Sequence, residues 1–289
     1  MRAFGNTGIS LPPIGLGGMP LSIAGRPVEA QSERVVMAAL DAGMRLIDTA
    51  DVYCLDQDDL GHNERLIAEA LRQWGREEQV LVATKGGCTR PDGRWGTDGR
   101  PDHLRRACEA SLKALKTERI WLYQLHAVDD SVPFEDSVAE LARLRTDGKI
   151  EHIGLSNVTA VQIRQACAIA PIASVQNRLG PLDTRPFRDG VITTCEELGI
   201  AFLAYSPVGG GRGKTRVAAD PVLTEIGAQV GASPFQVALA WLVQRSPVIF
   251  PIPGASKVSS ARSSAAALQL VLPPDAIARM DAAFVANAR

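Results

Sequence analysis

The chain contains the stretch Leu46-Ile47-Asp48-Thr49-Ala50-Asp51-Val52-Tyr53, in which an apolar run ends at a carboxylate and a phenol follows five residues later. An α/β barrel keeps its reactive groups at the carboxyl ends of its strands and on the loops that follow them. Taken alone, this stretch favours a structural role, in which Asp48 caps a turn and Tyr53 packs. The rest of the chain decides between these two interpretations.

An apolar run of strand length, followed by a longer segment with helical spacing, recurs about eight times along the chain. We expect strands at residues 14–18, 45–49, 80–85, 120–126, 151–155, 172–176, 201–205 and 248–252. We expect helices at residues 29–42, 62–74, 101–115, 134–147, 159–169, 187–198, 221–245 and 259–268, and one more at 273–285. Residues 86–101 and 207–220 are expected to be long loops.

This alternation predicts a (β/α)₈ TIM barrel that occupies residues 1–289 as a single domain. A doubly wound sheet is the alternative, but the units are evenly short and no linker divides the chain. Asn and Gly in Gly5-Asn6-Thr7-Gly8 are typical of a hairpin turn, so an N-terminal β-hairpin is expected to cap the barrel.

The composition is that of an ordinary globular protein, with 46% hydrophobic and 22% charged residues. The 31 basic and 32 acidic residues are mixed along the chain, which argues against a nucleic-acid or membrane partner. The five cysteines form no C-x-x-C pair, which argues against a disulfide framework and structural zinc, and we expect no metal site. Without a signal peptide or a bilayer-length apolar stretch, we expect a cytoplasmic protein that is a monomer or a weak homo-oligomer.

Polar side chains close most of the predicted strands, although the strands are otherwise apolar. Asp48, Lys85 and His126 end three consecutive strands. Ser156-Asn157, Gln176-Asn177 and Tyr205-Ser206 end the next three. In a barrel all of these groups meet at one mouth, and burying them together is costly unless they pair, so the cluster indicates a function.

These groups predict proton-transfer chemistry on a carbonyl. The Lys85 ammonium is expected to lower the pKa of Tyr53, and Asp48 is expected to hold Lys85 in place. His126 would orient a carbonyl oxygen while Tyr53 exchanges a proton with it. Since the set has no nucleophile and no hydride, a cofactor is implied.

The motifs together resemble the aldo-keto reductase family over nearly the whole chain, and the compact length is similar to that of short bacterial members. The resemblance rests on Gly15-Leu16-Gly17-Gly18, Asp48-Thr49-Ala50-x-x-Tyr53, Ala83-Thr84-Lys85, Leu125-His126, Gly154-Leu155-Ser156-Asn157-Val158, Val175-Gln176-Asn177, Ala204-Tyr205-Ser206-Pro207 and Ile252-Pro253-Gly254. It implies a barrel with a hairpin at its base, and NADPH extended across the mouth without a Rossmann domain. It also implies reduction of an aldehyde or ketone to an alcohol, or the reverse reaction.

The resemblance assigns the catalytic tetrad to Asp48, Tyr53, Lys85 and His126, with Tyr53 as the general acid in reduction. It implies that the cofactor is held by Gly18, Ser156, Asn157, Gln176, Tyr205, Ser206, Pro207, Gly209, Gly210, Gly254, Ala255, Ser256, Lys257 and Arg262. Trp95 and Arg178 are expected to contact a small-molecule carbonyl substrate, for which a pyridoxal-type aldehyde is one candidate. The segment after Lys257 departs from the family pattern, with Ser260, Ser263 and Ser264, so NADH stays open beside NADPH.

Two other functions remain open from the sequence. Lys85 at a strand end would also suit a barrel lyase that forms a Schiff base with its substrate. A cofactor-binding redox sensor without turnover is the second alternative. An ATP site at Gly213-Lys214-Thr215 is rejected, because Val208 stands where a P-loop requires its first Gly.

Overall fold

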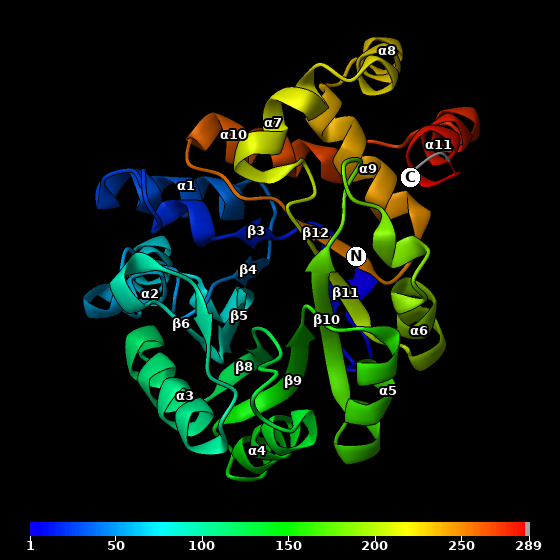
Figure 1. Ribbon diagram of the computed structural model, residues 1–289. Helices are drawn as coiled ribbons and strands as arrows, with labels where there is room; N and C mark the ends of the chain where they lie inside the picture. The colour runs from blue at the N-terminus through cyan, green and yellow to red at the C-terminus, as the bar shows by residue number, and fades with distance from the viewer. Residues whose placement is uncertain (287–289) are drawn as a thin grey trace.

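A computed structural model describes residues 1–286 of the chain, except for the side chain of Arg212. Within that part, eight parallel strands form one sheet in the order β12-β11-β10-β9-β8-β5-β4-β3. They are β3 (Leu16–Gly17), β4 (Leu46–Asp48), β5 (Leu81–Gly86), β8 (Ile120–Leu125), β9 (Ile150–Ser156), β10 (Ile172–Arg178), β11 (Ala201–Tyr205) and β12 (Ile249–Ile252). Each strand pairs with its neighbours in the chain, as a (β/α)₈ barrel requires (Figure 1).

The two outer strands of this sheet meet and close the barrel. Gly17 of β3 forms a parallel bridge with Gly254, which follows β12. The N–H of Gly15 donates to the carbonyl of Pro251 at 3.0 Å, and the N–H of Gly17 donates to the carbonyl of Pro253 at 3.0 Å. The predicted barrel is therefore confirmed, and this seam is held by hydrogen bonds donated from the β3 side.

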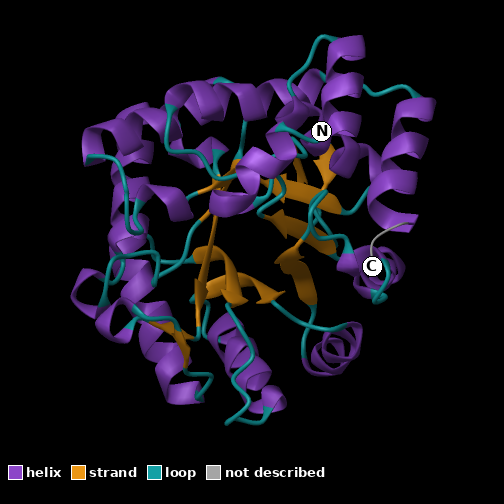
Figure 2. Cartoon of the chain, turned by 45° about the horizontal axis from the view of Figure 1, so that its top comes forward, coloured by secondary structure: helices purple, strands orange, loops and turns teal. Residues whose placement is uncertain are grey.

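Helices surround the strands, as Figure 2 shows. They are α1 (Glu29–Asp41), α2 (His62–Trp74), α3 (Pro101–Leu115), α4 (Phe134–Thr146), α5 (Ala160–Ile169), α6 (Val191–Leu198), α7 (Gly210–Ala218), α8 (Pro221–Val230), α9 (Pro234–Arg245), α10 (Val258–Ala266) and α11 (Pro274–Asp281). Short turns lie at Met19–Leu21, Gln57–Asp59, Glu77–Gln79, Pro91–Gly93, Arg185–Phe187, Ala267–Gln269 and Ala282–Ala286. The main hydrophobic core lies between the helices and the sheet, and includes Ile47, Ile153, Val175 and Trp241.

The N-terminal hairpin closes the base of the barrel, as predicted. Strand β1 (Arg2–Ala3) pairs antiparallel with β2 (Ser10–Leu11). Between them, the buried ring of Phe4 lies 5.1 Å from the ring of Trp121 and 5.0 Å from that of Phe250, measured between centroids. The hairpin fills the base with apolar side chains, so the reactive groups at the carboxyl ends of the strands face the other end.

Three of the predicted elements differ from the structure. Residues 221–245 were expected to be one helix, but they form α8 and α9, bent by 89°. The break has a local cause, since Gly231 adopts a left-handed conformation with φ 67° and Ser233 caps the helix that starts at Pro234. The expected loop at 207–220 contains α7, and the loop at 86–101 carries the hairpin of β6 (Cys88–Thr89) and β7 (Gly96–Thr97).

A search of residues 1–286 for membrane-spanning helices finds none that qualifies alone. Helices α8 and α9 pass by length and composition only when taken together as a bent pair. The expectation of one domain over residues 1–289 stays a prediction, and its last three residues lie outside the described part.

Candidate active site

Lys85 is the centre of a buried polar cluster at the carboxyl ends of β4 and β5. Its side chain is fully buried, and its Nζ lies 2.8 Å from Oδ2 of Asp48 and 3.0 Å from the hydroxyl of Tyr53. The third contact of Nζ is the carbonyl of Thr49, at 2.7 Å. An ammonium has three N–H donors, and all three are engaged here. The structure thus brings together three residues that the sequence placed at two separate strand ends.

Asp48 is held from its other side by two amides. Nε2 of Gln176 donates to Oδ1 of Asp48 at 2.7 Å, and Nε2 of Gln124 reaches the same oxygen at 3.4 Å. Both carboxylate oxygens therefore have partners, which makes the burial of this charge tolerable. Asp48 is consequently fixed in orientation and keeps the Lys85 ammonium beside Tyr53.

Tyr53 differs from the prediction in its acidity. Burial raises the pKa of its phenol well above the ordinary value, and the carboxylate of Asp48 raises it further. The predicted lowering of the Tyr53 pKa is therefore wrong in its net direction, because the loss of solvent around the phenol and the nearby carboxylate of Asp48 both raise it. The protonated phenol is the form that the site favours at neutral pH.

His126 lies beside Tyr53 and is also buried. The two rings meet edge to face with 5.7 Å between their centroids, and the ring of Trp95 meets His126 in the same manner at 6.0 Å. Burial, followed by the charge of Lys85, lowers the pKa of His126 well below its ordinary value. Its Nδ1 has no hydrogen-bond partner within residues 1–286. A neutral imidazole therefore stands next to the phenol.

A cavity of about 390 Å³ opens over these groups. It is lined by Gly17, Met19, Pro20, Ile23, Asp48, Tyr53, Trp95, His126, Ser156, Asn157, Gln176, Tyr205, Ser206, Pro207, Val208, Gly210, Gly211, Lys214, Ile252 and Gly254. Three members of the predicted tetrad reach the cavity, whereas Lys85 lies behind Tyr53 and does not line it. A ligand in this cavity would meet the phenol, the imidazole and the carboxylate, but not the amine.

The chain matches the model of the aldo/keto reductase family over residues 13–284. It belongs to the aldo-keto reductase family. It is 34% identical, over 299 aligned residues, to probable aldo-keto reductase 1 of Glycine max, an alignment that covers 93% of this chain and 84% of that protein. An oxidoreductase function follows from this membership.

Solved structures of the family have the same fold as this aldo-keto reductase. An aldo/keto reductase from Klebsiella pneumoniae in complex with NADP and acetate is 26% identical, with a TM-score of 0.81 over 98% of this chain and 95% of that one. A glycerol dehydrogenase from Gluconobacter oxydans is 25% identical, with a TM-score of 0.82 over 100% and 97%. The expected family and fold are thus confirmed.

The residues predicted to hold a cofactor fall into two groups. Ser156, Asn157, Gln176, Tyr205, Ser206, Pro207, Gly210 and Gly254 line the cavity, whereas Gly18, Gly209, Ala255, Ser256, Lys257 and Arg262 do not. Of the predicted substrate contacts, Trp95 lines the cavity and is 52% exposed. Arg178 is exposed and lies outside the lining, with its guanidinium 3.5 Å from the carbonyl of Gly209.

Side chains at the ends of β9, β10 and β11 hold one another in place. The hydroxyl of Tyr205 donates to Oδ1 of Asn157 at 2.9 Å, and Nδ2 of Asn157 donates to the carbonyl of His126 at 3.0 Å. Asn157 has a left-handed backbone with φ 57°, which a non-glycine residue adopts only when its surroundings enforce it. This chain of contacts fixes one wall of the cavity relative to His126.

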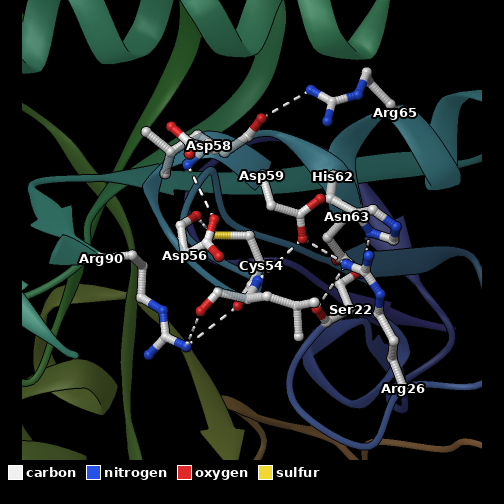
Figure 3. A network of polar contacts seen from close by, with 12 residues as sticks. Ser22, Arg26, Cys54, Asp56, Asp58, Asp59, His62, Asn63, Arg65 and Arg90 are labelled. Carbon is white, nitrogen blue, oxygen red and sulfur yellow. Dashed lines mark hydrogen bonds and ion pairs between the residues drawn. The ribbon is translucent and has the colours of Figure 1, made fainter. Parts of the chain in front are cut away.

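The loop after Tyr53 is anchored by a polar network, which Figure 3 shows. Arg26 pairs with Asp59, and Nδ2 of Asn63 donates to the hydroxyl of Ser22 at 2.7 Å. From the opposite side, the guanidinium of Arg90 donates to the carbonyl of Cys54 at 3.2 Å. The loop that carries the phenol is thus tied to the segment before α1 and to the β6–β7 hairpin.

Several residues that line the cavity were not predicted from the sequence. Lys214 reaches it from α7, and Met19, Pro20 and Ile23 reach it from the segment after β3. A signal for Lys214 was present, because a basic residue follows the glycines at 209–211. Residues 1–286 contain no group of three His, Cys, Asp or Glu side chains that could hold a metal ion.

Proposed function

We propose that this aldo-keto reductase uses NADPH to interconvert a small-molecule aldehyde or ketone and the corresponding alcohol, with Tyr53 as the general acid and base. The observation that carries the proposal is the buried contact of Tyr53, Lys85 and Asp48 at the floor of a cavity. The Klebsiella pneumoniae relative in complex with NADP supports the choice of cofactor. A reduced nicotinamide bound in the cavity would supply the hydride.

In reduction, the carbonyl carbon gains the hydride while its oxygen takes the proton of the Tyr53 hydroxyl. The raised pKa of Tyr53 keeps that proton on the phenol until negative charge develops on the carbonyl oxygen. Lys85 then stabilises the phenolate, because its ammonium already donates to the phenol oxygen at 3.0 Å. The neutral His126 is placed to donate an N–H to the carbonyl oxygen and so to orient it. In oxidation the same groups act in the opposite direction.

The cavity wall offers the groups that a nicotinamide nucleotide requires. Ser156, Asn157 and Gln176 present hydroxyl and amide groups suited to a carboxamide, and the ring of Tyr205 offers a stacking face. Gly210, Gly211 and Lys214 at the start of α7 suit a pyrophosphate. Lys257 and Arg262 are exposed and have no ion-pair partner within residues 1–286, which favours a 2′-phosphate and hence NADPH over NADH.

A lyase that forms a Schiff base on Lys85 is not supported by this geometry. Such a mechanism needs a free amine that faces the substrate. Lys85 is fully buried behind Tyr53, and each of its N–H groups already has a partner. Borohydride added with an aldehyde should therefore leave no adduct on Lys85. The activity test below distinguishes a reductase from a redox sensor that binds the cofactor without turnover.

The test of the proposal is Tyr53→Phe, which removes only the hydroxyl. We expect kcat for a panel of aldehydes to fall by about 10²- to 10⁴-fold, while fluorescence titration shows NADPH binding within about twofold of the wild type. Tyr123→Phe is a matched control, because Tyr123 is also buried but does not line the cavity, and its hydroxyl has no hydrogen-bond partner within residues 1–286. Unimpaired turnover in Tyr53→Phe would refute the assignment.

Location and assembly are also proposals. The five cysteines are free thiols in the described structure, which supports work in a reducing compartment such as the cytoplasm. We propose a monomer or weak homo-oligomer that needs no nucleic acid or membrane, and light scattering over a range of concentrations tests it.

A further inference from the structure

A second cavity, of about 510 Å³, lies between α2, α3 and strand β6, apart from the catalytic cavity. It is lined by Asp51, Gln57, Leu60, Gly61, Glu64, Arg65, Cys88, Thr89, Arg90, His103, Arg106, Ala107, Ala110, Lys113 and Ala114. We call it the side cavity. The two cavities share no lining residue. The proposed reaction makes no use of the side cavity.

Arg90 is the residue that gives the side cavity its chemical character. It is only 6% exposed, yet it has no ion-pair partner within residues 1–286. Its guanidinium donates to the main-chain carbonyls of Cys54 and Leu55 at 3.2 Å each, and Figure 3 shows Arg90 beside Cys54. The Nε of Arg90 has no hydrogen-bond partner in that part of the chain. A buried cation without a counter-charge is costly, so an anion in the adjoining cavity would stabilise it.

The exposed rim of the side cavity is also cationic. Arg65 and Lys113 have no ion-pair partner within residues 1–286, and Arg106 pairs only with the exposed Asp102. Two acids, Asp51 and Glu64, lie deeper in the cavity. Each already has a protein partner, since the N–H of Val52 donates to Oδ1 of Asp51 at 2.7 Å and the hydroxyl of Thr84 donates to Oε1 of Glu64, and burial raises the pKa of both carboxyls.

The remaining wall is apolar and leaves room for a hydrocarbon body. Ala107, Ala110 and Ala114 lie on one face of α3 at helical spacing, and Leu60 faces them from the loop before α2. Small side chains at three successive contact positions keep this space open. A free inorganic anion would satisfy the cations but leave the apolar wall without a partner.

We propose that the side cavity is a binding site for an organic anion with an apolar body, whose acidic group supplies the counter-charge of Arg90. The acidic group lies between Arg90 and the cationic rim, and the hydrocarbon body packs along α3. The β6–β7 hairpin separates this site from the catalytic cavity. Arg90 belongs to the side cavity, and its guanidinium lies 4.5 Å from the ring centroid of Trp95, which lines the catalytic cavity.

The contact between Arg90 and Trp95 provides a reporter of binding. Octanoate is the probe, because it combines a carboxylate with an apolar chain, and 1-octanol and inorganic phosphate each lack one of these features. We expect octanoate to bind the full-length protein saturably by calorimetry, at least about tenfold more tightly than either comparison compound. We also expect it to change the tryptophan emission, and this change should be lost in Trp95→Phe while calorimetric binding persists.

Three variants test the location of the site. Lys113→Glu should weaken octanoate binding about tenfold, because it replaces attraction by repulsion at the rim. Ala110→Trp should abolish binding by filling the apolar part of the cavity. Arg34→Glu is the matched control, since Arg34 is exposed on α1, far along the chain from the lining, and the change in net charge is the same.

Any of the following results would overturn the proposal. The first is equal binding of octanoate and 1-octanol, which would show that the cations do not select an anion. The second is wild-type affinity in both Lys113→Glu and Ala110→Trp, with circular dichroism showing that they are folded. The third is an emission change that survives in Trp95→Phe, or competition between octanoate and the carbonyl substrate, because either places the ligand elsewhere.

Discussion

Replacing Asp48 with Asn removes the charge that faces the Lys85 ammonium but keeps the shape of the side chain. Lys85 is fully buried and lies 2.8 Å from the carboxylate, so the variant leaves a cation without a counter-charge in a solvent-free site. Removing one partner of a buried ion pair typically costs about 3–5 kcal/mol. We therefore expect the free energy of unfolding at neutral pH to fall by about 3 kcal/mol or more.

The loss should depend on pH in a defined direction. Burial lowers the pKa of Lys85 in the folded wild type, and Asp48 opposes this shift, so the Asn variant should lower the pKa further. Between the folded pKa and the ordinary value near ~10.4, the unfolded chain binds more protons than the folded one, and stability rises with pH. The deficit of the variant should thus be largest near neutral pH and should shrink as the pH approaches about 10.

Urea denaturation of both proteins at several pH values between about 6 and 10 measures this effect. Asp41→Asn is the matched control, because Asp41 forms an exposed ion pair with Arg76 at 3.5 Å and should lose less than about 1 kcal/mol. The reasoning would be refuted if Asp48→Asn lowered the free energy of unfolding no more than the control does, or lowered it equally at every pH.

Three further predictions follow from the described contacts. Because burial holds the pKa of His126 well below its ordinary value, kcat/KM should show no imidazole ionisation between about pH 6 and 8; a step near 6.5 would contradict this. Gly154→Ala should cost about 1–3 kcal/mol in urea denaturation, since the new Cβ would lie 2.5 Å from Oγ of Ser174, whereas Gly211→Ala meets no atom within 4 Å and should be nearly neutral. Ser233→Ala removes the N-cap of α9 and should cost about 1 kcal/mol, read as a Tm lower by a few degrees; an unchanged Tm would contradict the cap.

The barrel was predictable because its strands are buried on both faces and end in polar groups. Residues 80–83 and 120–123 are apolar runs that begin two of these strands, and Lys85 and His126 mark where the strands reach the mouth. The break between α8 and α9 was also present in the sequence, as Gly231, Ser233 and Pro234. The apolar spacing continues across these residues, so periodicity alone does not reveal the break.

The composition of the site was predictable, but its electrostatics were not. Asp48, Tyr53 and Lys85 do meet, yet the pKa of Tyr53 moves upward, against the expectation. Acidity depends on how much solvent each group loses and on which charges are already paired, and both are properties of the assembled structure. In the same way, no pattern in the sequence predicts that Arg90 has no ion-pair partner within residues 1–286, because this depends on which distant segments the fold brings next to it.

The seam between β3 and β12 differs from the other strand pairs of the barrel in its hydrogen bonds. Pro251 and Pro253 have no N–H to donate. They take part in the seam only as acceptors, through carbonyls that receive the N–H groups of Gly15 and Gly17. Because few hydrogen bonds hold this seam, we expect it to open more readily than the other strand pairs, and amide hydrogen exchange should begin there. The catalytic cavity is lined from both sides of the seam, by Gly17 on one and Ile252 on the other. A dinucleotide bound across the seam would contact both sides of it and would therefore slow its local opening.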